Sequence, residues 1–197
     1  METERPPAPL LVIISGKLAT GKTTLGRRFA ADLSLPFFFK DGVKETLFDA
    51  LDAADRASSR RLGVASFTLL RYVTEAMLSA GQSLMIEANC LEEYDAPFYQ
   101  SALSRHGARI AQVWLTAAPE TILARFEHRA ASPQRHSGHV ELAHMDEFRS
   151  ALQDGDDAPL PLGGALLTVD TTDFATIAYH SLLNWLRSAL DGANTRG

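Results

Sequence analysis

The segment from Gly16 to Thr23 has the residue types and spacing of a phosphate-binding loop, G-x-x-x-x-G-K-[ST]. Gly16 and Gly21 let the backbone approach phosphates closely, because no side chain stands in the way. The free N–H groups at the start of the following helix favour negative charge. Lys22 would reach the β- and γ-phosphates, and the Thr23 hydroxyl would bind Mg²⁺. The sequence therefore predicts a site for a nucleoside triphosphate with Mg²⁺.

The expected nucleotide contacts cover the whole loop and the residue that follows it. They are Gly16, Lys17, Leu18, Ala19, Thr20, Gly21, Lys22, Thr23 and Thr24. Lys17 is unusual in such a loop, and it either adds positive charge near the phosphates or extends into solvent. We expect ATP to be the triphosphate, with GTP as the alternative.

Asp41 is the residue that we expect to act on a second substrate. It follows Pro36–Phe39, a short apolar run that we interpret as a strand. Open α/β sheets bind ligands at the carboxyl ends of their strands. A carboxylate there can orient a hydroxyl group and accept its proton during phosphoryl transfer. Asp41 also suits the N-cap of a helix, and the two roles can coexist. Lys40 and Lys44 flank it, and they either hold an anionic substrate or lie in solvent.

Glu87 ends another buried run and stands where an aspartate is usual in such proteins. A carboxylate at this place can support Mg²⁺ through water or bind substrate. The structural alternative is a hydrogen bond near the sheet edge. Asn89 follows on the same face, because strand side chains alternate, and it is placed to hydrogen-bond the acceptor.

A basic segment at about 125–140 is interpreted as a lid. Arg125 and Arg129 lie four residues apart and so share one helix face. The loop after them supplies Arg135, His136 and His139. Cations at such a place can stabilise the charge that spreads over a phosphoryl group during transfer, and a closing lid excludes water. The alternative is a solvated, charged helix end.

The segment Asp170-Thr171-Thr172 follows the last predicted strand. We expect it to cap the final helix. Loops at this place also contact nucleotide bases, so Thr171 is a candidate nucleotide contact.

The elements that must position these residues alternate between strands and helices, which predicts an α/β fold with a mostly parallel sheet. The expected strands are 10–14, 36–39, 83–88, 110–115 and 165–169. The expected helices are 22–33, 43–53, 65–80, 96–106, 119–129 and 174–190. We expect one domain at 10–192, with tails at 1–9 and 193–197.

Composition narrows the class of protein. The chain has 197 residues, a formal net charge of −5 and a single cysteine, Cys90. An intrachain disulfide is therefore excluded, and no overall positive charge attracts nucleic acid. No apolar run approaches the ~20 residues that span a bilayer. We expect a cytoplasmic protein that does not enter the membrane.

Four segments together resemble one family. They are Ser15–Leu25, Phe39–Glu45, Glu87–Asn89 and Arg135–His139. In this order they are similar to the small P-loop kinases related to chloramphenicol phosphotransferase and zeta toxins. The chain departs from that pattern at Lys17-Leu18, where Leu-Pro is common, and at Ser137, where proline is common.

The resemblance implies a three-layer P-loop NTPase fold. Its parallel sheet has five strands in the order 2-3-1-4-5, with helices on both faces and a lid. Asp41 corresponds to the aspartate that activates the acceptor, and Arg129 and Arg135 match lid arginines in type. The expected function is ATP-dependent phosphorylation of a hydroxyl group on a small molecule. The alternatives are a nucleic-acid kinase, which the acidic charge disfavours, and a nucleotide-dependent regulatory ATPase, for which no switch segment is evident.

Overall fold

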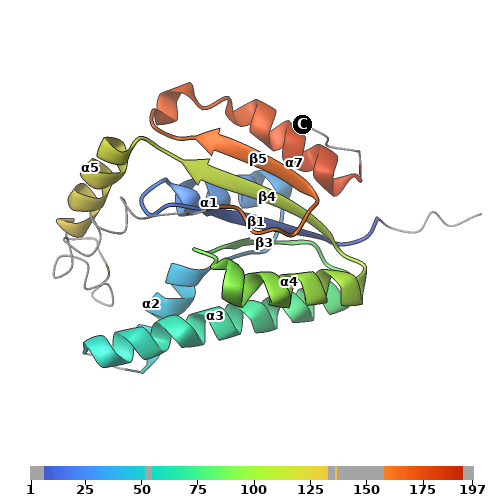
Figure 1. The fold of residues 1–197 in the computed structure, drawn as a ribbon, viewed down its shortest axis with the longest axis horizontal. Helices are drawn as coiled ribbons and strands as arrows, with labels where there is room; N and C mark the ends of the chain where they lie inside the picture. The colour runs from blue at the N-terminus through green and yellow to red at the C-terminus, as the bar shows by residue number, and fades with distance from the viewer. Residues whose placement is uncertain (1–6, 52–54, 133–135, 137–157, 193–197) are drawn as a thin grey trace, which may run out of the picture.

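The computed structural model describes residues 7–51, 55–132, 136 and 158–192. They form a parallel sheet with helices on both of its faces (Figure 1). Its strands are β1 (Leu10–Gly16), β2 (Phe37–Phe39), β3 (Leu84–Glu87), β4 (Arg109–Thr116) and β5 (Ala165–Asp170). The helices are α1 (Lys22–Leu33), α2 (Lys40–Ala50), α3 (Arg56–Ser79), α4 (Glu92–His106), α5 (Pro119–Ala130), α7 (Tyr179–Leu190) and the short 3-10 helix η2 (Phe174–Thr176). None of the described helices is long and apolar enough to cross a membrane.

The strand order is β2-β3-β1-β4-β5, which confirms the predicted order. All neighbouring strands run parallel, so their carboxyl ends meet at one edge of the sheet. The register places Ile14 beside Glu87 on one side of β1 and Gly16 beside Leu115 on the other. The loop after β1 therefore starts in the middle of that edge.

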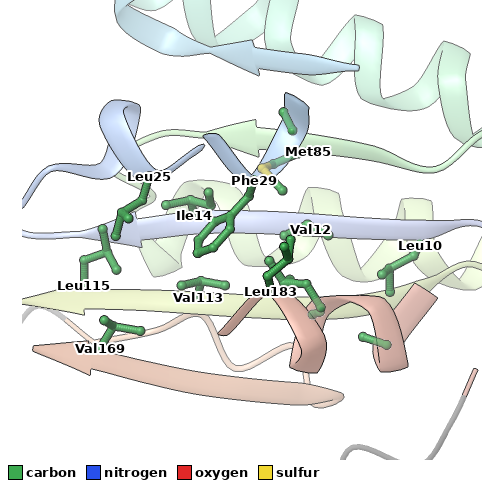
Figure 2. Close-up of a cluster of buried hydrophobic side chains, with 14 of the residues drawn as sticks. Leu10, Val12, Ile14, Leu25, Phe29, Met85, Val113, Leu115, Val169 and Leu183 are labelled. Atoms are coloured by element: carbon green, nitrogen blue, oxygen red, sulfur yellow. The ribbon is translucent and has the colours of Figure 1, made fainter. Parts of the chain in front are cut away.

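The central strand β1 is buried along its whole length, because helices cover both of its faces. Its side chains alternate between two apolar layers. Val12 and Ile14 belong to the layer that contains Phe29 of α1 and Leu183 of α7 (Figure 2). Leu11 and Ile13 belong to the opposite layer, which α3 and α4 cover. This packing fixes β1, and with it the start of the phosphate-binding loop.

Several helix boundaries differ from those predicted, and α4 begins at Glu92 rather than at residue 96. Helix α2 begins at Lys40 rather than at residue 43, directly after β2, so Asp41 lies in its first turn and Phe39 holds the N-cap position. Helix α3 begins at Arg56 because the Asp55 side chain accepts a hydrogen bond from the Ser58 N–H at 2.7 Å. The last predicted helix is divided into η2 and α7, and Ile177 between them has an extended backbone.

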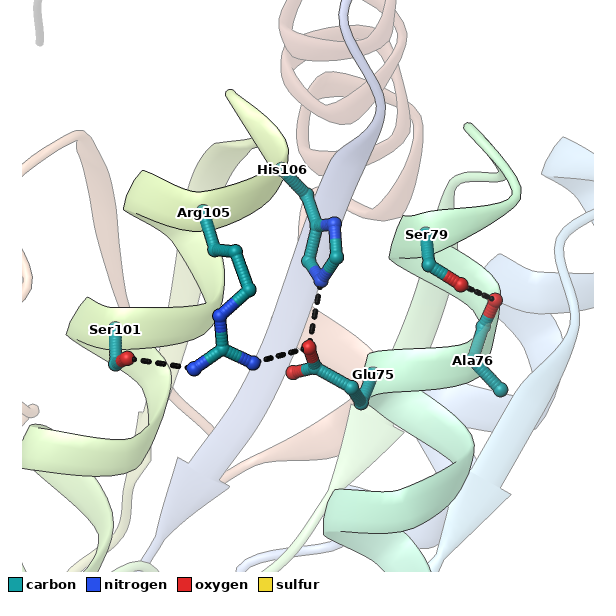
Figure 3. Close-up of polar contacts among 6 residues, drawn as sticks. All are labelled: Glu75, Ala76, Ser79, Ser101, Arg105 and His106. Carbon is teal, nitrogen blue, oxygen red and sulfur yellow. Dashed lines mark hydrogen bonds and ion pairs between the residues drawn. The ribbon is translucent and has the colours of Figure 1, made fainter.

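An ionic cluster joins α3 to α4 at their carboxyl-terminal ends (Figure 3). The Glu75 carboxylate accepts a hydrogen bond from Arg105 and lies 2.7 Å from His106 Nε2. The hydrogen bond with His106 is the largest influence that lowers the pKa of Glu75, and Arg105 adds to it against the opposing effect of burial. A carboxyl group with a lowered pKa in the folded state stabilises that state above its unfolded pKa, and this contribution disappears as pH falls through the folded pKa.

We expect Glu75→Gln to lower the free energy of unfolding by about 1 kcal/mol at neutral pH, because the ion pair with Arg105 is lost and the contact with His106 loses its charged carboxylate. The difference from the wild type should shrink at acidic pH, once the wild-type carboxyl also becomes protonated. Urea denaturation of both proteins at the two pH values measures this. A difference that does not change with pH would mean that the ionised carboxylate is not the stabilising species.

Candidate active site

The segment between β1 and α1 has a backbone conformation that requires its glycines. Gly16 has φ +132°, and a Cβ atom there would lie 2.1 Å from the Leu115 carbonyl oxygen. Gly21 has φ +86°, and a Cβ atom there would lie 2.1 Å from Phe174 Cζ. Ala19 between them is also left-handed, with φ +58°. A side chain at either glycine would therefore displace a neighbouring strand or ring, which is a structural reason for both motif glycines.

The loop leads into the N-terminus of α1, which is suited to binding an anion. Gly21 is the N-cap of α1, and no side chain caps the helix there. The first N–H groups of α1 thus face the loop, where a phosphate could accept their hydrogen bonds. The Lys22 ammonium donates to the carbonyls of Gly16 at 2.9 Å and Lys17 at 2.7 Å, and the residue is only 7% exposed. These bonds hold its positive charge beside the loop.

Thr23 and Glu87 meet at the centre of this edge. The Thr23 hydroxyl donates to Glu87 Oε2 at 2.8 Å. Glu87 is 6% exposed, and burial raises its pKa, while the charge of Lys22 and the bond from Thr23 act in the opposite direction. A hydroxyl and a carboxylate are the hard oxygen donors that Mg²⁺ prefers. The described residues contain no cluster of three or more His, Cys, Asp or Glu that could hold a metal.

A cavity of about 380 Å³ opens beside these groups. Its lining residues are Leu18, Ala19, Gly21, Lys22, Thr23, Thr24, Arg27, Phe39, Lys40, Asp41, Glu45, Glu87, Asn89, Arg125 and Arg129. The cavity therefore brings together the loop, both predicted carboxylates, Asn89 and two of the predicted lid arginines. Gly16, Lys17, Thr20 and Lys44 do not line it.

Asp41 enters the cavity from the first turn of α2. Its Oδ1 lies 3.2 Å from Lys40 Nζ, so the two side chains form an ion pair. Helix α2 has Phe39 at its N-cap and no side-chain cap, so Asp41 does not take the N-cap role that the sequence offered as an alternative. The carboxylate belongs to the lining of the cavity, together with residues of the phosphate-binding loop.

The predicted lid arginines divide into two groups. Arg125 and Arg129 line the cavity from α5. The Arg125 guanidinium donates to the Thr171 carbonyl at 2.7 Å and lies 4.9 Å from the centre of the Phe174 ring. Arg135 and His139 lie outside the described residues. His136 is described, and its Nε2 lies 3.0 Å from Asp49 Oδ1 on α2.

Comparison with known proteins assigns the chain to a family. The AAA_33 model, described as an AAA domain, matches residues 11–154. The chain belongs to the AAA_33 family. No protein in a search of curated sequences matches it significantly.

Solved structures with a similar fold include proteins described as kinases. A protein of Chloroflexus aurantiacus, provisionally described as a kinase, is 36% identical, with a TM-score of 0.83 over 92% of this chain and 98% of its own. A sugar kinase of Janibacter sp. HTCC2649 shares the fold at 17% identity, with a TM-score of 0.55 over 95% of this chain and 99% of its own. A structure from the PezAT toxin–antitoxin system of Streptococcus pneumoniae shares it at 14% identity, with a TM-score of 0.53 over 78% of this chain and 67% of its own.

Thr171 lies beneath the phosphate-binding loop rather than in the cavity wall. It is fully buried, with 0% exposure, and does not line the cavity. Its hydroxyl lies 2.8 Å from the Thr20 carbonyl and 2.9 Å from the Thr116 carbonyl. The Thr171 hydroxyl thus supports the phosphate-binding loop through the Thr20 carbonyl. The final helix is not capped from this segment either, because Asp170 bonds to Thr172 and Asp173 caps η2.

Sequence reasoning missed three residues that line the cavity, Arg27, Phe39 and Glu45. Arg27 follows Thr23 by four residues on α1, and Glu45 follows Asp41 by four residues on α2. Helical spacing places each on the same face as a predicted site residue, which is a signal that could have revealed both.

We expect Lys22→Met to weaken Mg-ATP binding roughly 10- to 100-fold, because a charge-assisted bond to phosphate is lost while the aliphatic stem remains. Lys17→Met should change the affinity by less than about threefold, since Lys17 does not line the cavity. Isothermal titration of both variants measures this. Wild-type affinity in a folded Lys22→Met protein would contradict the assignment of Lys22 to the phosphate site.

We expect Thr171→Val to destabilise the domain by about 1–3 kcal/mol, because valine keeps the shape but leaves the buried Thr20 carbonyl without this donor. The loop should then be held less firmly, so nucleotide affinity should fall as well. Thr171→Ser retains the hydroxyl and serves as the matched control. Thermal unfolding and nucleotide titration of the two variants test this, and equal behaviour of Val and Ser would remove the supporting role.

Proposed function

We propose that this AAA_33 protein is a kinase that transfers the γ-phosphoryl group of ATP to a hydroxyl group on a small molecule. One observation carries the proposal: a single cavity joins the phosphate-binding residues Lys22 and Thr23 to the Asp41 carboxylate on α2. Phosphoryl transfer needs the donor and the acceptor in one site, because catalysis depends mainly on positioning and electrostatics.

In the proposed reaction, the acceptor hydroxyl lies beside Asp41. Its oxygen forms a bond to the γ-phosphorus, and the bond from that phosphorus to the β,γ-bridging oxygen breaks. The hydroxyl proton passes to the Asp41 carboxylate, and ADP leaves with the electron pair of the broken bond. Lys40 Nζ lies 3.2 Å from Asp41 Oδ1, and this ion pair helps to position the carboxylate that would accept the proton.

Bound Mg²⁺ would neutralise charge on the β- and γ-phosphates. Thr23 and Glu87 are the residues that would hold it, with the Thr23 hydroxyl as a ligand and Glu87 acting through water. Their 2.8 Å hydrogen bond supports this, because it fixes the direction of the threonine oxygen.

Arg125 and Arg129 approach from α5, the element next to the predicted lid. We assign them the stabilisation of charge on the transferred group, together with Arg135. Arg125 is already held by the Thr171 carbonyl, so it would need little reorganisation when the nucleotide binds.

Within this function, the four motif segments favour a relationship to chloramphenicol phosphotransferase and zeta toxins. The acceptor class in this proposal is a small hydroxylated molecule, not a nucleic acid. The formal net charge of −5 supports this choice, because nucleic-acid binding relies on positive charge. We propose a cytoplasmic location, where ATP and Mg²⁺ are present.

We expect Asp41→Asn to reduce phosphate transfer by ~10²–10⁴, because general-base assistance is lost while the shape of the side chain is kept. Affinity for Mg-ATP should stay within about threefold of the wild type, since Asp41 does not belong to the phosphate-binding loop. The measurement is transfer from labelled ATP to a panel of small alcohols, with slow transfer to water as the baseline.

The nucleotide titration is the control for folding of the variant. If Asp41→Asn transfers phosphate to an accepted alcohol at the wild-type rate, the base is another group, and Glu87 is the next candidate. If the wild type hydrolyses ATP at a rate that no alcohol changes but a protein partner does, the regulatory ATPase is the better description.

A further inference from the structure

Arg27 is held in the cavity by a stack of aromatic rings. Its guanidinium carbon lies 4.9 Å from the centre of the Phe39 ring. The Phe39 ring in turn stacks on Phe37, with 5.4 Å between ring centres. Gly42 makes room for it, because a Cβ atom there would lie 2.4 Å from Phe39 Cζ. These contacts fix the position of the ring on which the arginine rests.

Stacking leaves the edge of the guanidinium available. The N–H groups of arginine point outward in the plane of the group, and an aromatic ring covers only its face. Among the described residues, no carboxylate forms an ion pair with Arg27. The fixed plane and the uncommitted donors are the features that favour two parallel hydrogen bonds to a carboxylate or a phosphate.

The position of Arg27 assigns it to the acceptor side. Phe39 lies beside Glu87 in the sheet register, and the chain continues from it directly to Lys40 and Asp41. The lid arginines approach from α5 instead. Attacking and leaving oxygens lie roughly in line during transfer, so the acceptor and the ADP portion lie on opposite sides of the phosphoryl group. A cation beside the proposed base therefore faces the acceptor.

We propose that Arg27 binds an anionic group, a carboxylate or a phosphate, on the acceptor molecule. The inference rests on the proposed function and specifies its substrate class as a hydroxylated acid or a hydroxylated phosphate ester. Glu45 lines the same cavity. Its carboxylate suits the hydroxyl groups of such a molecule and opposes a second anion, which restricts the acceptor to one anionic group near Arg27.

The test uses the full chain saturated with Mg²⁺ and a non-hydrolysable ATP analogue, so that the phosphate-binding loop is filled. Acetate and inorganic phosphate are then titrated separately, and the Arg27 Nε–H signal is followed by NMR together with the heat of binding. We expect one saturable anion site, at least about tenfold weaker in Arg27→Gln. Arg28→Gln is the matched control, because Arg28 is the next residue of α1 but rests on Tyr179 and does not line the cavity.

Each outcome decides the inference. Stronger binding of acetate would assign the site to a carboxylate, and stronger binding of phosphate would assign it to a phosphate ester. Equal anion binding by wild type and Arg27→Gln, or no saturable site when the nucleotide analogue is bound, would overturn the inference and leave the kinase proposal intact. Failure of the wild type to bind the nucleotide analogue would instead overturn the proposed function and this inference with it.

Discussion

The hydrogen bond between Thr23 and Glu87 connects the two halves of the site. Thr23 is the second residue of α1, and Glu87 is the last residue of β3, so the bond joins the start of α1 to the carboxyl end of β3. The Glu87 carboxylate is buried, and burying a charge is costly unless it is paired or hydrogen-bonded. Lys22 and Thr23 provide this compensation. Loop, helix start and β3 therefore hold one another in place.

The parallel sheet makes this arrangement possible. Parallel strands place all their carboxyl ends at one edge, and each connection starts or finishes there. Consequently β1 delivers the loop, β2 delivers Asp41 and β3 delivers Glu87 to the same region. On the other side of β1, the Thr171 hydroxyl after β5 contacts the Thr20 carbonyl, so the loop is supported from both halves of the sheet.

Elements that depend on local sequence patterns could be predicted from the sequence, and boundaries that depend on single contacts could not. Strand β1 and helix α1 follow from a continuous apolar run and from helical spacing, both of which are local patterns. The start of α3 was missed because the helix begins directly after the capping residue Asp55, ahead of the residues whose apolar spacing indicates a helix. Helix α2 was predicted to start at residue 43, with Asp41 as a possible cap, but it starts at Lys40 without a side-chain cap. Boundaries of this kind depend on single contacts that a periodic pattern does not contain.

The sequence by itself determined the phosphate-binding loop, the alternation of strands and helices, and the identity of the carboxylates at the strand ends. These features depend on residues that are close together along the chain. Only the tertiary structure decided that Thr171 is buried under the loop, and that Arg27 rests on Phe39 inside the cavity. The reason is that both positions result from packing between segments far apart in the sequence. Strand register and ring packing determine which side chains line the same cavity, and the local spacing of residues predicts neither of them.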